Sequence, residues 1–85
     1  MYILRCSDGS LYVGQTSDVA RRLRRHDEGL AAVHTARHRP VQLVHVERFE
    51  TREDSLKRER QLKGWRRAKK EALIVGDGAE LKRLR

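Results

Sequence analysis

The segment that most constrains the fold of this chain is its first fourteen residues, where two short apolar runs flank a turn-forming triplet. Residues 2–6 and 10–14 are predicted as β-strands. Ser7-Asp8-Gly9 between them contains the residues that favour a tight chain reversal. The chain is therefore expected to begin with a β-hairpin, to which the later elements add.

The hairpin contains both tyrosines of the chain, Tyr2 and Tyr12, and its register decides whether they meet. A two-residue loop places them on opposite faces of the sheet. A three-residue loop with Gly9 in the left-handed conformation places them on the same face as Leu4. The sequence permits both registers. We expect the second, because a site that uses both tyrosines requires it.

Further elements are predicted after the hairpin. Ser17 is expected to cap a helix over about residues 18–28, and Thr51 to open a helix that ends near Lys63, before Gly64. The other expected elements are a third strand over residues 41–49, central or well covered in its sheet, a helix over 66–75 and a short basic terminal helix. The order ββαβααα, with strands early and helices late, predicts a small α+β fold.

The chain is strongly basic: 20 lysines and arginines against 12 aspartates and glutamates give a formal charge of +8. Arginine predominates, and its guanidinium matches phosphate geometry and keeps its charge at any relevant pH. We therefore expect a polyanionic partner, bound with an affinity that falls as the salt concentration rises. A generally basic surface or a ribosome-associated protein has the same charge, because net charge indicates partners rather than fold.

Length and composition exclude several classes of protein. At 85 residues the chain is expected to form one domain with one modest core. Its one cysteine, Cys6, excludes a disulfide framework and a multi-cysteine zinc site, and we expect it to pack within a strand. No signal peptide and no apolar run of membrane-spanning length is found. We therefore expect a cytoplasmic protein without a membrane partner.

Glu59 is the most informative single residue. Leu56, Glu59 and Leu62 are spaced three apart, so the carboxylate lies on or beside the apolar stripe of its predicted helix. A carboxylate there needs a cation, and Mg²⁺ is suitable because it is often held by one or two carboxylates and several waters. Considered alone, Glu59 is also compatible with an ion pair to a nearby arginine on a solvated face.

Arg22 and His26 are four residues apart and share one face of a predicted helix. Arg22 is a candidate for binding a phosphate and stabilising charge on its oxygens, and His26 for proton transfer or a hydrogen bond to the phosphate. The surrounding run, residues 21–26, also has the composition of an ordinary basic helix face. Tyr2 and Tyr12 by themselves are compatible with ordinary strand aromatics.

Two of the four histidines, His34 and His38, have the i,i+4 spacing of a helical metal site. They lie in a basic stretch that is predicted as a loop before Pro40, and no cysteine or acidic residue is close to them in the sequence. We therefore do not expect a zinc site there.

In combination these residues resemble the GIY-YIG nuclease superfamily. The two signature triplets are matched loosely by Met1-Tyr2-Ile3 and Tyr12-Val13-Gly14, Arg22 follows eight residues later, and Glu59 lies in its expected place. Each triplet alone is weak, but the ordered set is specific. The chain looks most similar to small stand-alone bacterial members related to the N-terminal nuclease domain of UvrC. The likeness covers residues 1–75, with 76–85 expected as a short basic helix or tail.

The resemblance implies a three-stranded antiparallel sheet flanked by helices, and metal-dependent hydrolysis of a phosphodiester bond. It implies that Glu59 holds a single Mg²⁺ or Mn²⁺ ion, that Arg22 clamps the phosphate, and that Tyr2 or Tyr12 orients and deprotonates the attacking water. His26 matches a histidine that some members carry one helical turn after the arginine.

The leading hypothesis from the sequence is an endonuclease that acts on DNA rather than RNA, with a role in DNA repair or processing. The alternative is a non-catalytic nucleic-acid-binding module that retains the fold. An RNA-associated structural protein also fits the charge but leaves the tyrosine, arginine and glutamate set unexplained. The sequence does not indicate a protein partner or a substrate structure. The predicted backbone-binding residues are Arg21, Arg24, Arg25, Arg37, Arg39, Lys57, Arg58 and Arg60.

Overall fold

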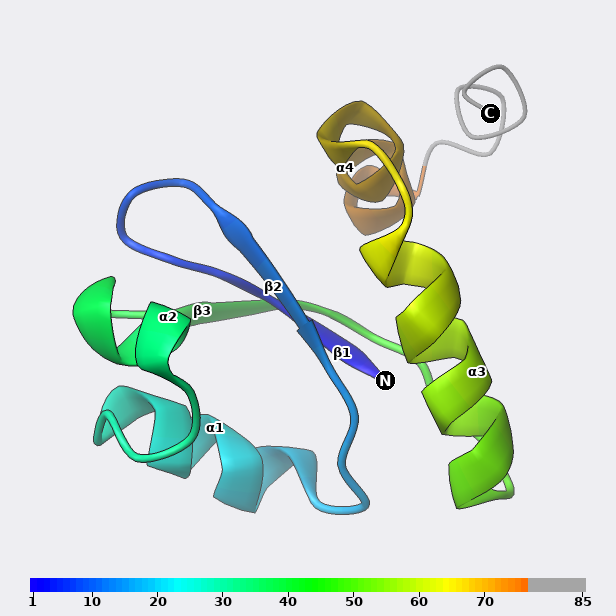
Figure 1. The fold of residues 1–85 in the computed structure, drawn as a ribbon, viewed down its shortest axis with the longest axis horizontal. Helices are drawn as coiled ribbons and strands as arrows, with labels where there is room; N and C mark the ends of the chain where they lie inside the picture. Colours follow the sequence, from blue (N-terminus) through cyan, green and yellow to red (C-terminus); the bar gives the residue numbers. More distant parts are fainter. Residues whose placement is uncertain (77–85) are drawn as a thin grey trace.

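A three-stranded antiparallel sheet forms the centre of the computed structural model, which describes residues 1–76 (Figure 1). The strands are β1 (Tyr2–Arg5), β2 (Leu11–Gly14) and β3 (Gln42–Val46), in the order β2-β1-β3. The predicted α+β fold with a three-stranded antiparallel sheet is confirmed. The third strand was expected to be central or well covered, but β3 is an edge strand whose residues are at most partly buried. The central strand is β1, because its apolar run is buried on both faces.

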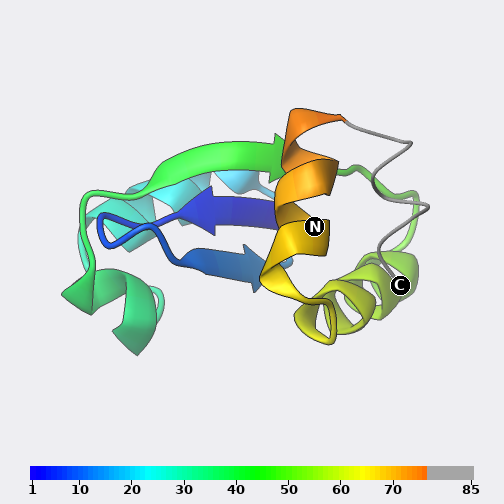
Figure 2. The same ribbon diagram turned by 90° about the horizontal axis from the view of Figure 1, so that it is seen from above.

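Four helices are described around the sheet: α1 (Val19–Asp27), α2 (Val33–Arg37), α3 (Arg52–Lys63) and α4 (Arg67–Val75). Helix α1 lies across one face of the sheet, whereas α3 and α4 pack at its other side (Figures 1 and 2). Within the described part of the chain, none of these helices has the length and apolar character needed to cross a membrane.

The hairpin has the register in which the two tyrosines share a face. Leu4 is paired with Tyr12, and Gly9 has a φ of 85°, as a three-residue loop with a left-handed glycine requires. The amide of Cys6 donates to the carbonyl of Ser10 at 2.9 Å and closes the loop. The predicted register is therefore confirmed.

Helix α1 begins one residue later than predicted. Its cap is Asp18 and not Ser17: the Asp18 backbone is extended, and its side chain accepts a hydrogen bond from the Arg21 amide at 3.0 Å. The predicted cap of α3 is confirmed, since the Thr51 side chain accepts from the Asp54 amide.

Helix α2 was not predicted. It has five residues and no side-chain cap, so neither periodicity nor capping signalled it in a stretch expected to be a loop. The element order over the described residues is ββααβαα, which places a second helix before the third strand. The predicted terminal helix falls on residues 77–85, outside the described part.

The two faces of the sheet have different neighbours. On one face, Ile3 and Val13 pack with Met1 and Leu62 in an apolar cluster that Trp65 and residues of α4 extend. On the other face, Tyr2, Leu4 and Tyr12 point toward α1 and α2, because side chains two residues apart along a strand share a face. The second face carries the predicted site residues of the hairpin.

Candidate active site

A chain of hydrogen bonds leads from the sheet through α1 to α2. The Thr35 hydroxyl donates to the carbonyl of Ala32 at 3.2 Å, so its oxygen accepts from Nδ1 of His26 at 2.7 Å. With Nδ1 carrying the proton, Nε2 of His26 accepts from the Tyr2 hydroxyl at 2.9 Å. The arrangement selects one tautomer of a neutral His26, and Thr35 is the residue that selects it.

Burial sets the protonation states of this chain. His26 is 0% exposed, and burial, followed by repulsion from Arg22, lowers its pKa below 6.5. Tyr2 is 2% exposed, and burial raises its pKa to about 12; the charges of ionised Tyr12 and Glu59 add to this rise, whereas Arg22 opposes it. At neutral pH Tyr2 is therefore a protonated hydrogen-bond donor and His26 a neutral acceptor.

Gly14 makes room for the Tyr2 side chain. The two residues are directly paired across β1 and β2, and the Tyr2 ring crosses the position that a Cβ of Gly14 would take. Such a Cβ would lie 2.5 Å from Cζ of Tyr2, closer than atoms can approach without movement. The glycine of the second signature triplet is thus required by the tyrosine of the first.

The two tyrosines lie together but in different environments. Their ring centroids are 6.4 Å apart, and the Tyr12 ring lies 5.0 Å from that of His26, edge to face. Tyr2 is buried and bonded to His26, whereas Tyr12 is only partly buried. Tyr12 is therefore the tyrosine that a substrate can approach.

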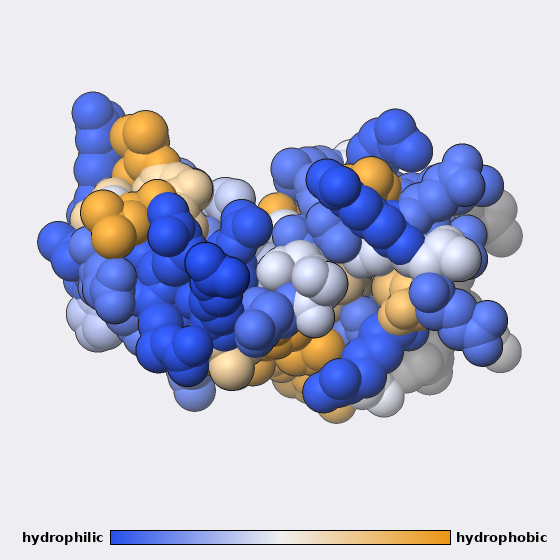
Figure 3. All heavy atoms as spheres, turned by 90° about the horizontal axis from the view of Figure 1, so that it is seen from below, coloured by the Kyte–Doolittle hydropathy of each residue, from blue (hydrophilic) through white to orange (hydrophobic). Residues whose placement is uncertain are grey.

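Arg22, on α1, lines two neighbouring hollows of the surface. One, of about 410 Å³, is bordered by Arg21 and Arg25 of the same helix. The other, of about 270 Å³, lies between the loop after β2 and the start of α3, and Arg52 and Ser55 contribute to it. Seen from the side of α1, hydrophilic side chains cover most of the surface, which a notch divides into two parts (Figure 3). Arg52 was not predicted as a site residue.

Glu59 lies on α3 one helical turn after Ser55, and its side chain is 17% exposed. Its carboxylate pairs with the exposed Lys63 at 3.0 Å. The alternative of an ion pair to a nearby basic residue is therefore found in the structure, with a lysine in place of the expected arginine and with the carboxylate itself largely covered. A carboxylate oxygen is a donor that a hard divalent cation accepts, and Lys63 can swing away into solvent, so Glu59 fits the ion that the resemblance implies.

The predicted backbone-binding residues divide into two groups. Arg39 and Arg58 are bonded to other parts of the protein: Arg39, although exposed, donates to the carbonyls of Asp27 and Ala36, and the half-buried Arg58 pairs with Glu47 at 2.8 Å. The other six residues are all exposed: Arg21, Arg24 and Arg25 on α1, Arg37 on α2, and Lys57 and Arg60 on α3.

The sequence did not indicate two features that the fold assembles. Thr35 was not a candidate, because nothing local connects it to a histidine nine residues earlier. No cysteine or acidic residue is close to the histidine pair in the sequence, but the fold places His34 beside Cys6 and Asp8, so the reason given against a metal site there does not hold in space. The i,i+4 spacing of His34 and His38 was the one local signal for the second feature.

Comparison with known proteins gives consistent matches. Residues 1–72 match the family model of the GIY-YIG catalytic domain. A UPF0213 protein of Haloquadratum walsbyi is 51% identical over 73 residues, covering 86% of this chain and 82% of the relative. One of Staphylococcus saprophyticus is 46% identical over 74 residues, covering 87% and 90%. The solution NMR structure of a UPF0213 protein of Bacillus halodurans, 38% identical, matches with a TM-score of 0.57 over 95% of this chain and 88% of the other.

Proposed function

This chain belongs to the GIY-YIG family, a nuclease-type family, and from that premise we propose that it is a divalent-metal-dependent endonuclease. The reaction is hydrolysis of a phosphodiester bond, with DNA as the substrate and DNA repair or processing as the role. One observation carries the proposal: the hydrogen bond from Tyr2 to His26, with the Tyr12 ring 5.0 Å from the imidazole, joins three predicted catalytic residues in one place.

The two tyrosines have separate roles in this proposal. Tyr2 keeps its proton at neutral pH and holds His26, so it positions the site rather than accepting a proton from water. Tyr12 is partly exposed and orients the attacking water. His26 is neutral, is held in one tautomer by Thr35, and accepts the hydrogen bond from Tyr2. Its ring also contacts the Tyr12 ring edge to face and so limits where that ring can lie.

Arg22 and Glu59 supply the charges. Arg22 lines both hollows, where its guanidinium binds the scissile phosphate and offsets the charge that develops on its oxygens. Glu59 holds a single Mg²⁺ or Mn²⁺ ion. When bound, that ion supplies positive charge that activates water or stabilises the leaving oxygen.

The exposed arginines of α1 supply sequence-independent affinity. Arg21 and Arg25 border the larger hollow beside Arg22, so a nucleic-acid backbone that enters the site meets them first. Replacement of Arg21 by Ala is expected to weaken binding of all sequences alike and to lower the salt slope by about one.

A cleavage assay tests the proposal. Labelled single-stranded, duplex and branched DNA, with matched RNA strands, are incubated with Mg²⁺ or with EDTA. Wild type is compared with Glu59→Gln, which keeps the shape of the side chain and removes its charge. We expect Mg²⁺-dependent cutting that falls about 100-fold or more in Glu59→Gln, because loss of the metal ligand removes several kcal/mol of transition-state stabilisation.

The matched control is Glu53→Gln, which changes an exposed glutamate in the first turn of the same helix. It is expected to cut like wild type, and both variants are expected to bind DNA at least as tightly, because each removes a negative charge. Binding without cutting in every metal tried would reject the enzyme and favour the non-catalytic module. Cutting of RNA alone would correct the substrate.

A further inference from the structure

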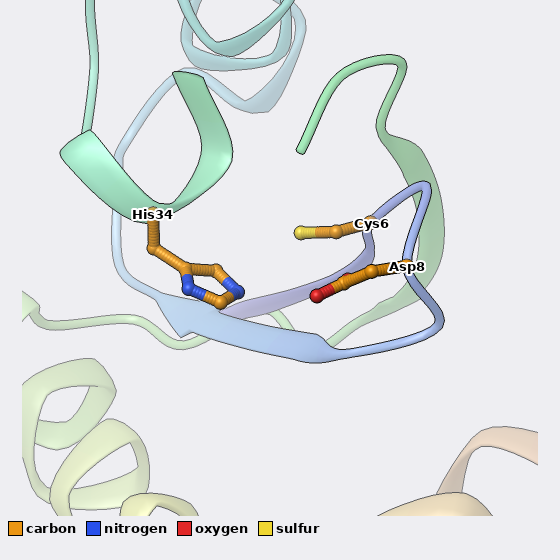
Figure 4. A group of neighbouring side chains, drawn as sticks. All are labelled: Cys6, Asp8 and His34. Carbon is orange, nitrogen blue, oxygen red and sulfur yellow. The ribbon is translucent and has the colours of Figure 1, made fainter. Parts of the chain in front are cut away.

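A second group of side chains of the metal-ligand type lies at the hairpin turn, and none of them is among the residues assigned to the candidate active site. Cys6 directly follows β1, Asp8 lies in the turn, and His34 lies on α2. The sulfur, a carboxylate oxygen and an imidazole nitrogen all lie within 4.8 Å of one another. Figure 4 shows the three side chains pointing into one space between the turn and α2.

His38 is the fourth residue at this place. It follows His34 by one helical turn, and the two imidazole rings are 4.8 Å apart. Its Nδ1 lies 3.4 Å from the Asp8 carboxylate. The Ser10 hydroxyl donates to Asp8 at 2.6 Å and accepts from Nε2 of His34 at 2.7 Å, which keeps both side chains directed toward the same space. Three ligand-type side chains therefore converge, and His38 lies at their edge, beside Asp8 and His34.

The chemistry of these donors selects the class of ion. One thiolate, one carboxylate and two imidazoles make a four-donor set of the kind that tetrahedral Zn²⁺ takes. The thiolate disfavours Mg²⁺ and Ca²⁺, which prefer oxygen ligands. Two negative charges from Cys6 and Asp8 balance the dication in a chain whose net charge is +8.

We propose that Cys6, Asp8, His34 and His38 bind a divalent transition metal ion, Zn²⁺ above others, which fastens α2 to the hairpin turn. Binding forms a metal–sulfur bond, and the proton of the Cys6 thiol passes to solvent. The Ser10 bridge opens as the carboxylate and the imidazole turn to the ion.

An ion at this place would stabilise α2, a helix that carries a residue of the candidate active site. The helix has five residues and no side-chain cap, so it has little stability of its own. It nevertheless carries Thr35, whose hydroxyl selects the tautomer of His26. The backbone amide of Ser7 donates a hydrogen bond to the carbonyl of His38 at 2.9 Å, which already joins the turn to the end of the helix. An ion bound by the four side chains would fix α2 to the hairpin turn and thereby keep Thr35 in its position beside His26.

Cobalt binding by the full-length, reduced protein tests the site. Co²⁺ bound to a thiolate in a tetrahedral site shows a sulfur-to-metal charge-transfer band and intense visible bands, which Zn²⁺ then removes. We expect one thiolate-bound ion per chain, no loss of the charge-transfer band with excess Mg²⁺, and loss of that band in Cys6→Ser. In His34→Ala, which changes an exposed side chain and leaves the fold intact, affinity should fall about 10-fold or more.

The matched control is His45→Gln, which changes a histidine of β3 outside the group. Its affinity and spectrum should equal those of wild type. A spectrum without the charge-transfer band, or equal affinity in His34→Ala and His45→Gln, would overturn the site. Because Cys6 is buried and its variant can unfold, the His34 comparison decides on its own.

Amide hydrogen exchange tests the clamp. Zn²⁺ is expected to slow exchange of the α2 amides in wild type and to leave it unchanged in His34→Ala. If Zn²⁺ binds but α2 exchanges equally fast with and without it, the ion is not a clamp. None of these measurements uses cleavage, so they test the metal site independently of the proposed nuclease activity.

Discussion

The two faces of the central strand bury side chains equally well but by different means. Toward α3, Ile3 and Leu62 are both 0% exposed and meet only apolar neighbours of their cluster. Toward α1 and α2, Tyr2 and His26 are just as deeply buried, yet each depends on a hydrogen bond. One face is a hydrophobic core, whereas the other also encloses a polar network beside the apolar Leu4.

The difference decides what each face can do. Apolar packing is non-directional and scales with the area removed from water, so the α3 face supplies stability. A buried hydrogen-bond chain contributes little net stability, but its donors and acceptors must stay in place because an unpaired one is costly. The α1 face therefore provides fixed geometry, which is what a reacting site needs.

Truncation of the apolar face should have the largest effect. Leu62→Ala is expected to lower the free energy of unfolding by about 2 to 5 kcal/mol, because it leaves a cavity beside a completely buried position. Denaturant unfolding followed by circular dichroism measures this change. Val75→Ala, at a position 75% exposed, serves as the control and should change the free energy by less than about 0.5 kcal/mol.

The second largest effect is expected when a methyl group is added on the face that carries the hydrogen-bond network. Gly14→Ala is expected to cost about 1 to 3 kcal/mol and to displace Tyr2 from His26, since the added methyl group meets the tyrosine ring. The displacement is read from the ¹H and ¹⁵N shifts of the His26 ring. Gly64→Ala adds the same methyl group 3.6 Å from its nearest neighbour, an ordinary contact, and should leave both measurements near wild type. Equal shifts in the two variants would contradict the role given to Gly14.

Removal of one hydrogen-bond acceptor from the network should lower the free energy of unfolding by about as much as Gly14→Ala, or by less. Thr35→Val keeps the shape of the side chain but leaves Nδ1–H of His26 without its partner, so we expect a loss of about 1 to 3 kcal/mol in unfolding free energy. Thr35→Ser retains the hydroxyl and should recover most of it. If valine and serine prove equally stable, Thr35 only fills space. In the cleavage assay, the valine variant should also lose rate while binding DNA normally.

The smallest predicted effect is a pH dependence. Because the pKa of His26 is below 6.5 in the folded protein, the unfolded chain binds a proton that the folded protein does not as the pH falls below 6.5. Unfolding free energy should therefore be unaffected by His26 above pH 6.5 and should decrease as the pH falls through the folded-state pKa. Unfolding curves across this window measure the change. His26→Gln should show a flatter dependence; an identical slope would mean that His26 is not the group responsible.

Much of the fold followed from short-range signals. The triplet before Ser10 predicted the hairpin, and Gly9 took the left-handed conformation that the three-residue loop needs. Thr51 marked the start of α3 because a cap acts within one turn. Helix α2 was missed for the same reason: without a cap and with five residues, it has no local signature.

The candidate site was only partly predictable. The order and spacing of Tyr2, Tyr12, Arg22 and Glu59 indicated the family, which the comparisons confirm over residues 1–72. Spacing did not indicate which tyrosine is buried, or that Glu59 pairs with Lys63. Nor did it separate the exposed Arg21 from Arg58, which is paired with Glu47. These distinctions depend on burial and on partners from other elements.

The sequence by itself determined the hairpin, the main helices and the family, because these depend on residues a few positions apart and on their order. Only the tertiary structure decided that β1 is the central strand, that Thr35 orients His26, and that Cys6 and Asp8 lie beside His34. The physical reason is the distance along the chain over which each kind of interaction acts. Turn and capping preferences act over one to four residues, whereas Cys6 and His34 are 28 residues apart and are brought together by the packing of α1 and α2 on the sheet.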